Sequence, residues 1–274
     1  MRCAVLGSPI EHSLSPALHR AAYAEFGLDW RYDAVEVGEA DLARFVAALD
    51  ADWRGLSLTM PLKRAVIELL DSADPLVEAT GVANTVVVNQ GALAGFNTDI
   101  PGAARAIRER WAEPLESAVI LGGGATAASL GWALADAGCT TISVVVRNQA
   151  HAAETVAVIG RHPAGPRLRV SDLTSWRGSE SHILASTIPV AAQTSELLER
   201  AENAGASVVF DVIYDPWPTP LSVWATQSGR SVVSGLDLLV HQAALQVELM
   251  TGRVPSIEGM RQAGLAELAA RARQ

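Results

Sequence analysis

A glycine-rich turn in the middle of the chain has the residue types and spacing of a phosphate-binding loop. The apolar run Ala118–Leu121 ends in Gly122-x-Gly124-x-x-Ala127, and a helical pattern follows. One glycine makes a tight turn, another lets the backbone approach a pyrophosphate, and a small third residue lets the helix pack on the strand. The helix N-terminus then offers N–H groups to the anion. The pattern predicts a dinucleotide site here.

The residue that follows the next expected strand, Ile142–Val146, favours one of the two nicotinamide dinucleotides. A carboxylate at this place binds the ribose 2′-hydroxyl of NAD, but the chain has Arg147 and Asn148 instead. A planar cation suits a 2′-phosphate. Arg147 therefore favours NADP, although a solvated arginine at a strand end is a common alternative.

Polar side chains in the first hundred residues could bind a small oxygenated ligand. Ser13 and Ser15 stand where a helix begins, and two hydroxyls beside helix N–H groups can receive a carboxylate. Ser15 could equally be only the helix cap, followed by Pro16. Lys63 follows a strand end, where an amine would point into a cleft. Asn84 and Asp99 supply an amide and a carboxylate, or are turn residues.

The elements that must position these side chains alternate between strand and helix patterns, which predicts a largely parallel α/β architecture. In the first half we expect strands at 2–6, 31–37 and 56–59, helices at 16–26, 41–49, 62–70 and 100–110, and a hairpin of 85–88 with 93–95. In the second half we expect strands at 118–121, 141–146, 182–186, 208–212 and 231–233, and helices at 125–137, 236–251 and 257–271.

These patterns predict two α/β domains, an N-terminal substrate-binding domain and a Rossmann dinucleotide-binding domain. We place the substrate domain at 1–103, the Rossmann domain at 104–235, and C-terminal helices at 236–274 that pack back on the first domain. A cleft between two domains is a usual place for a small-molecule site.

Composition narrows the function classes. The formal net charge of −9 argues against a nucleic-acid partner. Since no run of 18 apolar residues occurs and the N-terminus is strand-like, we expect neither a membrane span nor a signal peptide. Two cysteines, Cys3 and Cys139, predict neither a disulfide framework nor a metal site, and favour a reduced, cytoplasmic protein.

Six ordered motifs resemble those of the shikimate dehydrogenase family, over nearly the whole chain. They are Gly7-Ser-Pro-Ile-Glu-His-Ser-Leu-Ser-Pro-Ala-Leu-His19, Leu58-Thr-Met-Pro-Leu-Lys63, Val82-Ala-Asn-Thr85, Asn97-Thr-Asp-Ile-Pro-Gly102, Asp211-Val-Ile-Tyr-Asp-Pro-Trp-Pro-Thr-Pro-Leu221 and Ser234-Gly-Leu-Asp-Leu-Leu-Val-His-Gln-Ala-Ala244. Enzymes of this family reduce 3-dehydroshikimate to shikimate with NADPH, in the pathway to aromatic amino acids.

The resemblance implies a role for each matching residue. Ser13 and Ser15 would bind the substrate carboxylate, and Lys63 would be catalytic, paired with Asp99. The other substrate contacts would be Thr59, Asn84, Asp99, Tyr214 and Gln242. The cofactor site would be lined by Gly122, Gly123, Gly124, Ala125, Thr126, Arg147, Thr187, Val212 and Gly235. We expect NADP(H), a small-molecule substrate, no metal, and a monomer or homodimer.

Departures from the family pattern occur at three places. The usual Asn-Val-Thr is Ser57-Leu58-Thr59, so a hydroxyl replaces an amide. The adenosine-site pattern Asn-Arg-Thr-x-x-Arg keeps its first cation, Arg147, and has His151 for the second, which weakens the preference for NADP over NAD. The Asn-Ala-Thr stretch becomes Ser186-Thr187-Ile188.

Alternative functions remain at this point. A quinate or aminoshikimate dehydrogenase of the same superfamily would bind a similar carboxylate. A catalytically silent ligand sensor would keep the fold but not need Lys63 or Asp99. We expect His12, His19 and His241 to be structural rather than catalytic, and Trp217 to be a packing residue.

Overall fold

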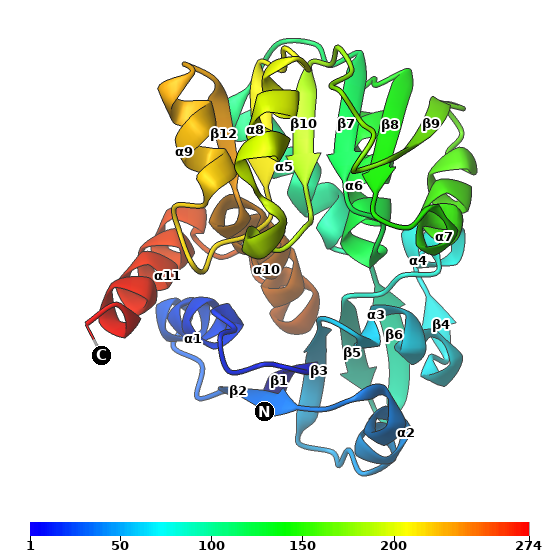
Figure 1. Cartoon of the computed structure of the whole chain (residues 1–274). Helices are drawn as coiled ribbons and strands as arrows, with labels where there is room; N and C mark the ends of the chain where they lie inside the picture. Colours follow the sequence, from blue (N-terminus) through cyan, green and yellow to red (C-terminus); the bar gives the residue numbers. More distant parts are fainter. Residues whose placement is uncertain (274) are drawn as a thin grey trace. The chain divides into compact units, whose positions relative to one another are not determined.

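A computed structural model describes residues 1–273, with His151 described by its backbone only. The chain divides into two compact units. Unit 1 consists of Met1–Thr98 together with the segment from Leu239 onward, and unit 2 is Asp99–Leu238. Each is built on its own sheet (Figure 1).

The sheet of unit 1 has the strand order β2-β1-β3-β5-β6-β4. Its strands are β1 (Arg2–Gly7), β2 (Arg31–Glu36), β3 (Trp53–Leu58), β4 (Ser72–Ala73), β5 (Thr85–Asn89) and β6 (Ala92–Phe96). The first three run parallel, whereas β5 is antiparallel to both β3 and β6. The hairpin expected around Asn89–Gly91 is therefore confirmed.

Alternation along β3 decides which helices cover each face of this sheet. Leu56 and Leu58 enter a core with α2 (Glu39–Ala47) and α3 (Leu62–Ala65). Gly55 and Ser57 point to the opposite face. There the side chain of Met250, from α10 (Gly235–Thr251), lies against Gly55. The helices α1 (Ser15–Glu25) and α11 (Ile257–Arg271) contact each other. The C-terminal helices thus pack on the first domain, as expected.

The sheet of unit 2 is parallel throughout, with the order β12-β11-β10-β7-β8-β9. Its strands are β7 (Ser117–Leu121), β8 (Thr141–Val146), β9 (Arg167–Asp172), β10 (Ile183–Ser186), β11 (Val208–Asp211) and β12 (Ser231–Ser234). Because β8 and β10 flank β7 on opposite sides, the strand order reverses beside β7. Ligands of open α/β sheets bind outside the carboxyl ends of the strands at such a switch point.

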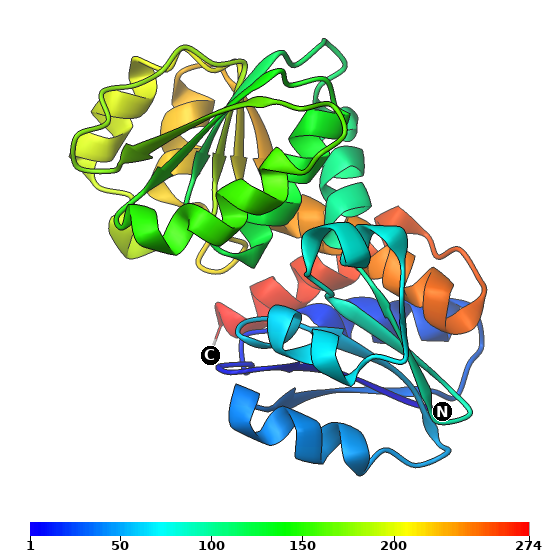
Figure 2. The ribbon, with the colours of Figure 1, turned by 90° about the vertical axis from the view of Figure 1, so that its right-hand side faces the viewer.

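Helices cover both faces of the unit 2 sheet (Figure 2). The helices α8 (Ser195–Glu202) and α9 (Pro220–Gln227) pack on one face through Leu197 and Leu221. The helix α6 (Ala125–Asp136) contacts α5 (Asp99–Arg110) and α7 (Gln149–Gly160). A Rossmann-type domain is confirmed.

Several elements differ from the sequence prediction, which did not include α7, α8 or α9. The helix expected over 62–70 is an α-helix only to Ala65, and a 3₁₀ helix continues it over Val66–Leu69. The strand β9 was not predicted, since its mostly exposed or half-exposed residues give no apolar run. The short elements β4 and α4 (Pro75–Thr80) were also missed; Asp74 caps α4 through the N–H of Val77.

Candidate functional site

In unit 1, the loops that follow β1 and β3 lie side by side. The N–H of Ser8 donates to the carbonyl of Met60 at 2.9 Å. A Cβ on Gly7 would overlap the Thr59 side chain and reach the Met60 carbonyl. Gly7 thus permits the close approach of the two loops, and it places the segment that leads to Ser13 beside Thr59.

The two serines lie where α1 begins. Ser15 is the first residue of α1 and is buried, and its N–H donates to the Ser13 hydroxyl at 3.3 Å. The preceding Leu14 is the N-cap residue, and α1 has no side-chain cap. The alternative that Ser15 caps the helix is therefore wrong. The Arg271 guanidinium of α11 donates to the carbonyls of His12 and Ser13, at 2.9 and 3.1 Å, and so holds this turn.

Asn84 and Gln242 lie together in a buried amide cluster with Thr98. The Asn84 Oδ1 accepts from the Thr98 N–H at 2.8 Å, and Nδ2 donates to the Gln242 Oε1 at 3.2 Å. Asn84 is 1% and Gln242 6% exposed. The structure thus brings two predicted substrate residues together, although 158 positions separate them in the chain.

Lys63 lies on α3, immediately after the β3 loop, and its side chain is half-buried. Its carbonyl accepts from the N–H of Ala83 at 2.9 Å, which holds α3 beside the residue that precedes Asn84. Asp99 is 5% exposed and begins α5, in unit 2.

The glycine loop of unit 2 has the geometry that its sequence predicts. Gly122 has φ +114°, a value that side chains disfavour, and an added Cβ would overlap the Thr187 hydroxyl. The Thr155 hydroxyl of α7 holds the loop by donating to the Gly123 carbonyl at 2.7 Å. Gly124 is the N-cap of α6, and no described side chain caps that helix. These features fit a pyrophosphate at the α6 N-terminus.

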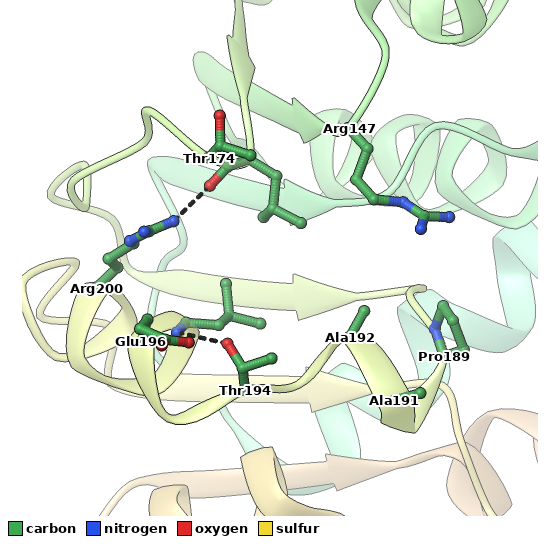
Figure 3. Close-up of a pocket in the computed structure, with 10 residues that line it drawn as sticks. Arg147, Thr174, Pro189, Ala191, Ala192, Thr194, Glu196 and Arg200 are labelled. Atoms are coloured by element: carbon green, nitrogen blue, oxygen red, sulfur yellow. Dashed lines mark hydrogen bonds between the residues drawn. The ribbon is translucent and has the colours of Figure 1, made fainter.

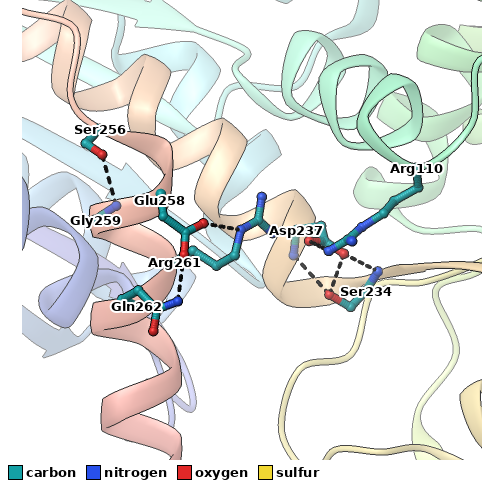
Figure 4. Close-up of polar contacts among 8 residues, drawn as sticks. All are labelled: Arg110, Ser234, Asp237, Ser256, Glu258, Gly259, Arg261 and Gln262. Carbon is teal, nitrogen blue, oxygen red and sulfur yellow. Dashed lines mark hydrogen bonds and ion pairs between the residues drawn. The ribbon is translucent and has the colours of Figure 1, made fainter.

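Gly235 and Val212 meet at the ends of β12 and β11. A Cβ on Gly235 would overlap the Val212 carbonyl, so this approach requires glycine. Ser234 and Asp237 fix the turn, because the Ser234 N–H donates to Asp237 at 2.9 Å and the Ser234 hydroxyl accepts from the Asp237 N–H (Figure 4). Burial would raise the pKa of Asp237, but bonds from Arg110 and Ser234 outweigh it and hold that pKa below its ordinary value.

A cavity of about 360 Å³ opens at the ends of β8, β9 and β10 (Figure 3). Arg147 and Pro189 lie at one end of it, and Glu196 and Arg200 at the other. Arg147 on its wall follows β8, and the Val145 carbonyl of β8 accepts from the Gly122 N–H of the glycine loop at 2.9 Å. The cavity is roomy enough for part of a dinucleotide. The position of Arg147 on its wall fits the predicted adenosine end. The side chain of His151 lies outside the described part of the structure.

A buried carboxylate that sequence reasoning left without a role holds the loop of Tyr214. Asp211 is 0% exposed and accepts from Gln193 at 2.8 Å and from Thr219 at 2.7 Å. Burial raises its pKa, although these bonds oppose the shift. Asp211 thereby fixes both ends of the loop that runs from β11 to α9. The aspartate of the D-x-x-Y motif could have suggested such an anchor.

The residues that we expected to be structural differ in how far they are buried. His19 is fully enclosed, whereas His12 is exposed and His241 is buried. Trp217 is 40% exposed, and its expected packing role stays a prediction. Cys3 and Cys139 are buried and unbridged. Among the side chains that the structure describes, no group of three potential metal ligands occurs, and none of the described helices has the length and hydropathy of a membrane span.

The two units define a class of protein. Unit 2 is a dinucleotide-binding domain by its topology, its glycine loop and its close-approach glycines. Unit 1 presents hydroxyls, amides and a lysine at the loop ends of a second α/β sheet. This combination is that of a nicotinamide-dependent oxidoreductase with a separate substrate domain.

Comparison with known proteins identifies the family. Residues 5–86 match the shikimate dehydrogenase substrate binding domain, and residues 235–263 match the shikimate 5′-dehydrogenase C-terminal domain. A shikimate dehydrogenase (NADP(+)) of Bacillus cereus is 35% identical over 265 residues, which cover 94% of this chain and 95% of that protein. The chain belongs to the shikimate dehydrogenase family, and the resemblance drawn from its motifs is confirmed.

Solved structures agree with this assignment. The shikimate dehydrogenase of Mycobacterium tuberculosis is 37% identical, with a TM-score of 0.87 over 97% of this chain and 99% of that one. The quinate dehydrogenase of Corynebacterium glutamicum is 26% identical, with a TM-score of 0.88 over 97% and 99%. Since the two TM-scores are nearly equal, backbone similarity does not separate shikimate from quinate, and the site residues must do so.

Proposed function

We propose that this protein reduces 3-dehydroshikimate to shikimate with NADPH, as a step in aromatic amino acid biosynthesis. The observation that carries the proposal is the cluster of hydroxyl and amide donors around Asn84 and Gln242 in unit 1, in a chain 35% identical to NADP-dependent shikimate dehydrogenases over nearly its whole length. A ring that bears a carboxylate and several hydroxyls is the kind of ligand such donors bind.

Each substrate residue has a place in this proposal. Ser13 and Ser15 bind the carboxylate, since their hydroxyls lie at the start of α1, whose dipole favours an anion. Asn84 and Gln242 bond the ring hydroxyls from their shared cluster. Thr59, from the neighbouring loop, and Tyr214, from the loop that Asp211 anchors, complete the contacts.

Lys63 is the catalytic residue in this proposal. Bound NADPH supplies the hydride, and negative charge builds on the C3 oxygen of the substrate. The Lys63 ammonium stabilises that charge and gives the oxygen its proton. The Asp99 carboxylate orients the ammonium and bonds a neighbouring hydroxyl of the ring. A silent sensor has no need of such a pair, and so the sensor alternative is not favoured.

NADP is the cofactor that the chain's own residues favour. Arg147 lines the cavity at the ends of β8, β9 and β10, where it can bond a 2′-phosphate. Gly122 to Thr126, Thr187, Val212 and Gly235 supply the remaining surface for the dinucleotide. A shikimate dehydrogenase of Thermus thermophilus, 31% identical over 97% of this chain, has been solved with NADP(H) and shikimate.

The test is a steady-state assay of shikimate and quinate, each with NADP+ and with NAD+. The proposal expects turnover of shikimate with a preference for NADP+. Activity mainly on quinate with NAD+ would instead place the protein with the quinate dehydrogenases, whose Corynebacterium glutamicum member has been solved with NAD.

The proposal also covers partners and location. We infer that the protein works on small molecules alone, because its acidic net charge disfavours a nucleic-acid partner. The unbridged cysteines favour the cytoplasm. We also propose that the protein is a monomer or homodimer. Size-exclusion chromatography with light scattering measures the oligomeric state, and a larger assembly would contradict this part.

A further inference from the structure

Gln246 of α10 lies at the centre of a buried network that the family motifs do not include. Its side chain is 1% exposed. The Oε1 atom accepts from the Ser57 hydroxyl at 2.7 Å and lies 3.2 Å from the His19 Nε2. The Nε2 atom donates to the Thr85 hydroxyl at 2.9 Å and to the Asn84 carbonyl at 3.2 Å. One carboxamide therefore joins α1, β3 and the start of β5.

The orientation of the Gln246 amide is set by its partners. The Asn84 carbonyl can only accept, so the amide nitrogen must face it. Oε1 then faces Ser57 and His19, and the His19 Nε2 must carry a proton to donate. All hydrogen-bonding positions of the amide are used, as a buried polar network requires.

The bonds continue from Gln246 into the proposed substrate site on two sides. On one side, the His19 ring that Gln246 bonds lies one turn after Ser15 on α1, and the Tyr32 hydroxyl donates to Ser57 at 2.5 Å. On the other side, the Thr85 hydroxyl donates to the Asn84 Oδ1 at 2.9 Å. Gln246 thus links a proposed carboxylate-binding residue to a proposed ring-binding residue.

We propose that Gln246 is a positioning residue for the substrate, which sets the location and hydrogen-bonding direction of Asn84 through Thr85, and the location of Ser15 through His19. The inference rests on the proposed function for the assignment of Asn84 and Ser15 to the substrate.

A merely structural role predicts a different result from a positioning role. A structural residue lowers the fraction of folded enzyme, and hence the apparent kcat, without changing KM. A positioning residue changes the affinity for the ligand whose contacts it aligns. Gln246 bonds residues of the substrate site in unit 1. We therefore expect its substitution to raise the KM for shikimate and to leave the KM for NADP+ nearly unchanged.

The experiment compares Gln246→Met with Thr80→Val in the full-length protein. Methionine fills a similar volume without the four hydrogen bonds. Thr80 is 1% exposed and bonds the Leu76 carbonyl, so Thr80→Val removes a buried bond of unit 1 outside the network. We expect Gln246→Met to raise the KM for shikimate about tenfold, with the KM for NADP+ changed less than about twofold. Thr80→Val leaves both KM values unchanged.

Three further variants complete the test. Gln246→Ala with Ser57→Asn returns a carboxamide to the cavity from the β3 side, and is expected to recover most of the affinity lost in Gln246→Ala. Asn84→Ala separates the two hypotheses. If it raises the shikimate KM but Gln246→Met does not, the positioning role is wrong. If neither does, Asn84 is not a substrate residue, and the site assignment fails along with the inference built on it.

Discussion

We expect the free energy of unfolding to decrease at acidic pH because of one buried histidine, His19. The ring is 0% exposed and stacks on Tyr32 with centroids 3.9 Å apart. Its Nε2 bonds Gln246, whereas Nδ1 has no partner within the described residues. Burial lowers the pKa of His19 to about 3, although the bond to Gln246 opposes the shift. A second ring proton would lie on Nδ1 with nothing to accept it.

The size of the effect follows from linkage. An unfolded histidine has a pKa of about 6.5. A depressed folded pKa contributes stability that is present above pH 6.5 and is lost as the pH falls toward 3, because the unfolded chain takes up a proton that the folded chain refuses. The loss approaches about 1.4 kcal/mol per pH unit below the unfolded pKa, and amounts to about 2.3 kcal/mol between pH 6.5 and 4.5. This is a large part of a typical stability of about 5–15 kcal/mol.

The assay compares wild type with His19→Gln, whose amide nitrogen can still donate to Gln246. Urea unfolding at pH 7.5, 6.5, 5.5 and 4.5 measures the two stabilities, and titrating carboxylates cancel in their difference. The free energy of unfolding of wild type minus that of His19→Gln should fall by about 2.3 kcal/mol between pH 6.5 and 4.5. An NMR titration gives a direct check, because the His19 ring signal should stay neutral down to pH 5. Parallel stability curves, or a ring that titrates near pH 6.5, would refute the argument.

Three other substitutions test the remaining assignments. Lys63→Ala should lower kcat about 10²- to 10⁴-fold while shikimate still binds in a calorimetric titration, and near-normal turnover would remove Lys63 from the mechanism. Gly122→Ala should weaken NADPH binding about tenfold or more, as followed by cofactor fluorescence, because its Cβ overlaps the Thr187 hydroxyl at φ +114°. Arg147→Gln should raise the ratio of the NADP+ KM to the NAD+ KM about tenfold, and an unchanged ratio would show that Arg147 does not bind the 2′-phosphate.

Sequence pattern predicted the parts of this protein that repeat a simple physical rule. The strand β8 has the bounds that its apolar run gives, Thr141–Val146, and the helix α11 likewise covers Ile257–Arg271. Gly122 was predictable because a positive φ and a close approach both require glycine. The edge strand β9 was not, since strands at a sheet edge need no apolar run, and its burial pattern alternates weakly.

The residues that hold the site in place were harder to foresee than the residues that line it. Gln246 stands on an apolar helix, and no spacing rule distinguishes it from a surface glutamine. Thr155 is a similar case, because Gly123, whose carbonyl it bonds, lies 32 positions away and becomes a neighbour only through the fold. Asp211 belongs to a motif, but its partner Gln193 lies 18 positions away and has no place in that motif.

Burial gives such residues a physical signature once the fold is known. A polar group that is buried without hydrogen bonds destabilises a protein. Each buried polar side chain therefore needs hydrogen-bond partners, and a function that an apolar side chain could not perform. In unit 1 the enclosed polar side chains include Ser57, Asn84, Thr85, Gln242 and Gln246, and they are joined to one another by hydrogen bonds. An apolar repacking could fill the same volume. Its absence is explained if the network's task is to fix the direction of donors that a hydroxylated substrate must meet, which is what the comparison of Gln246→Met with Thr80→Val measures.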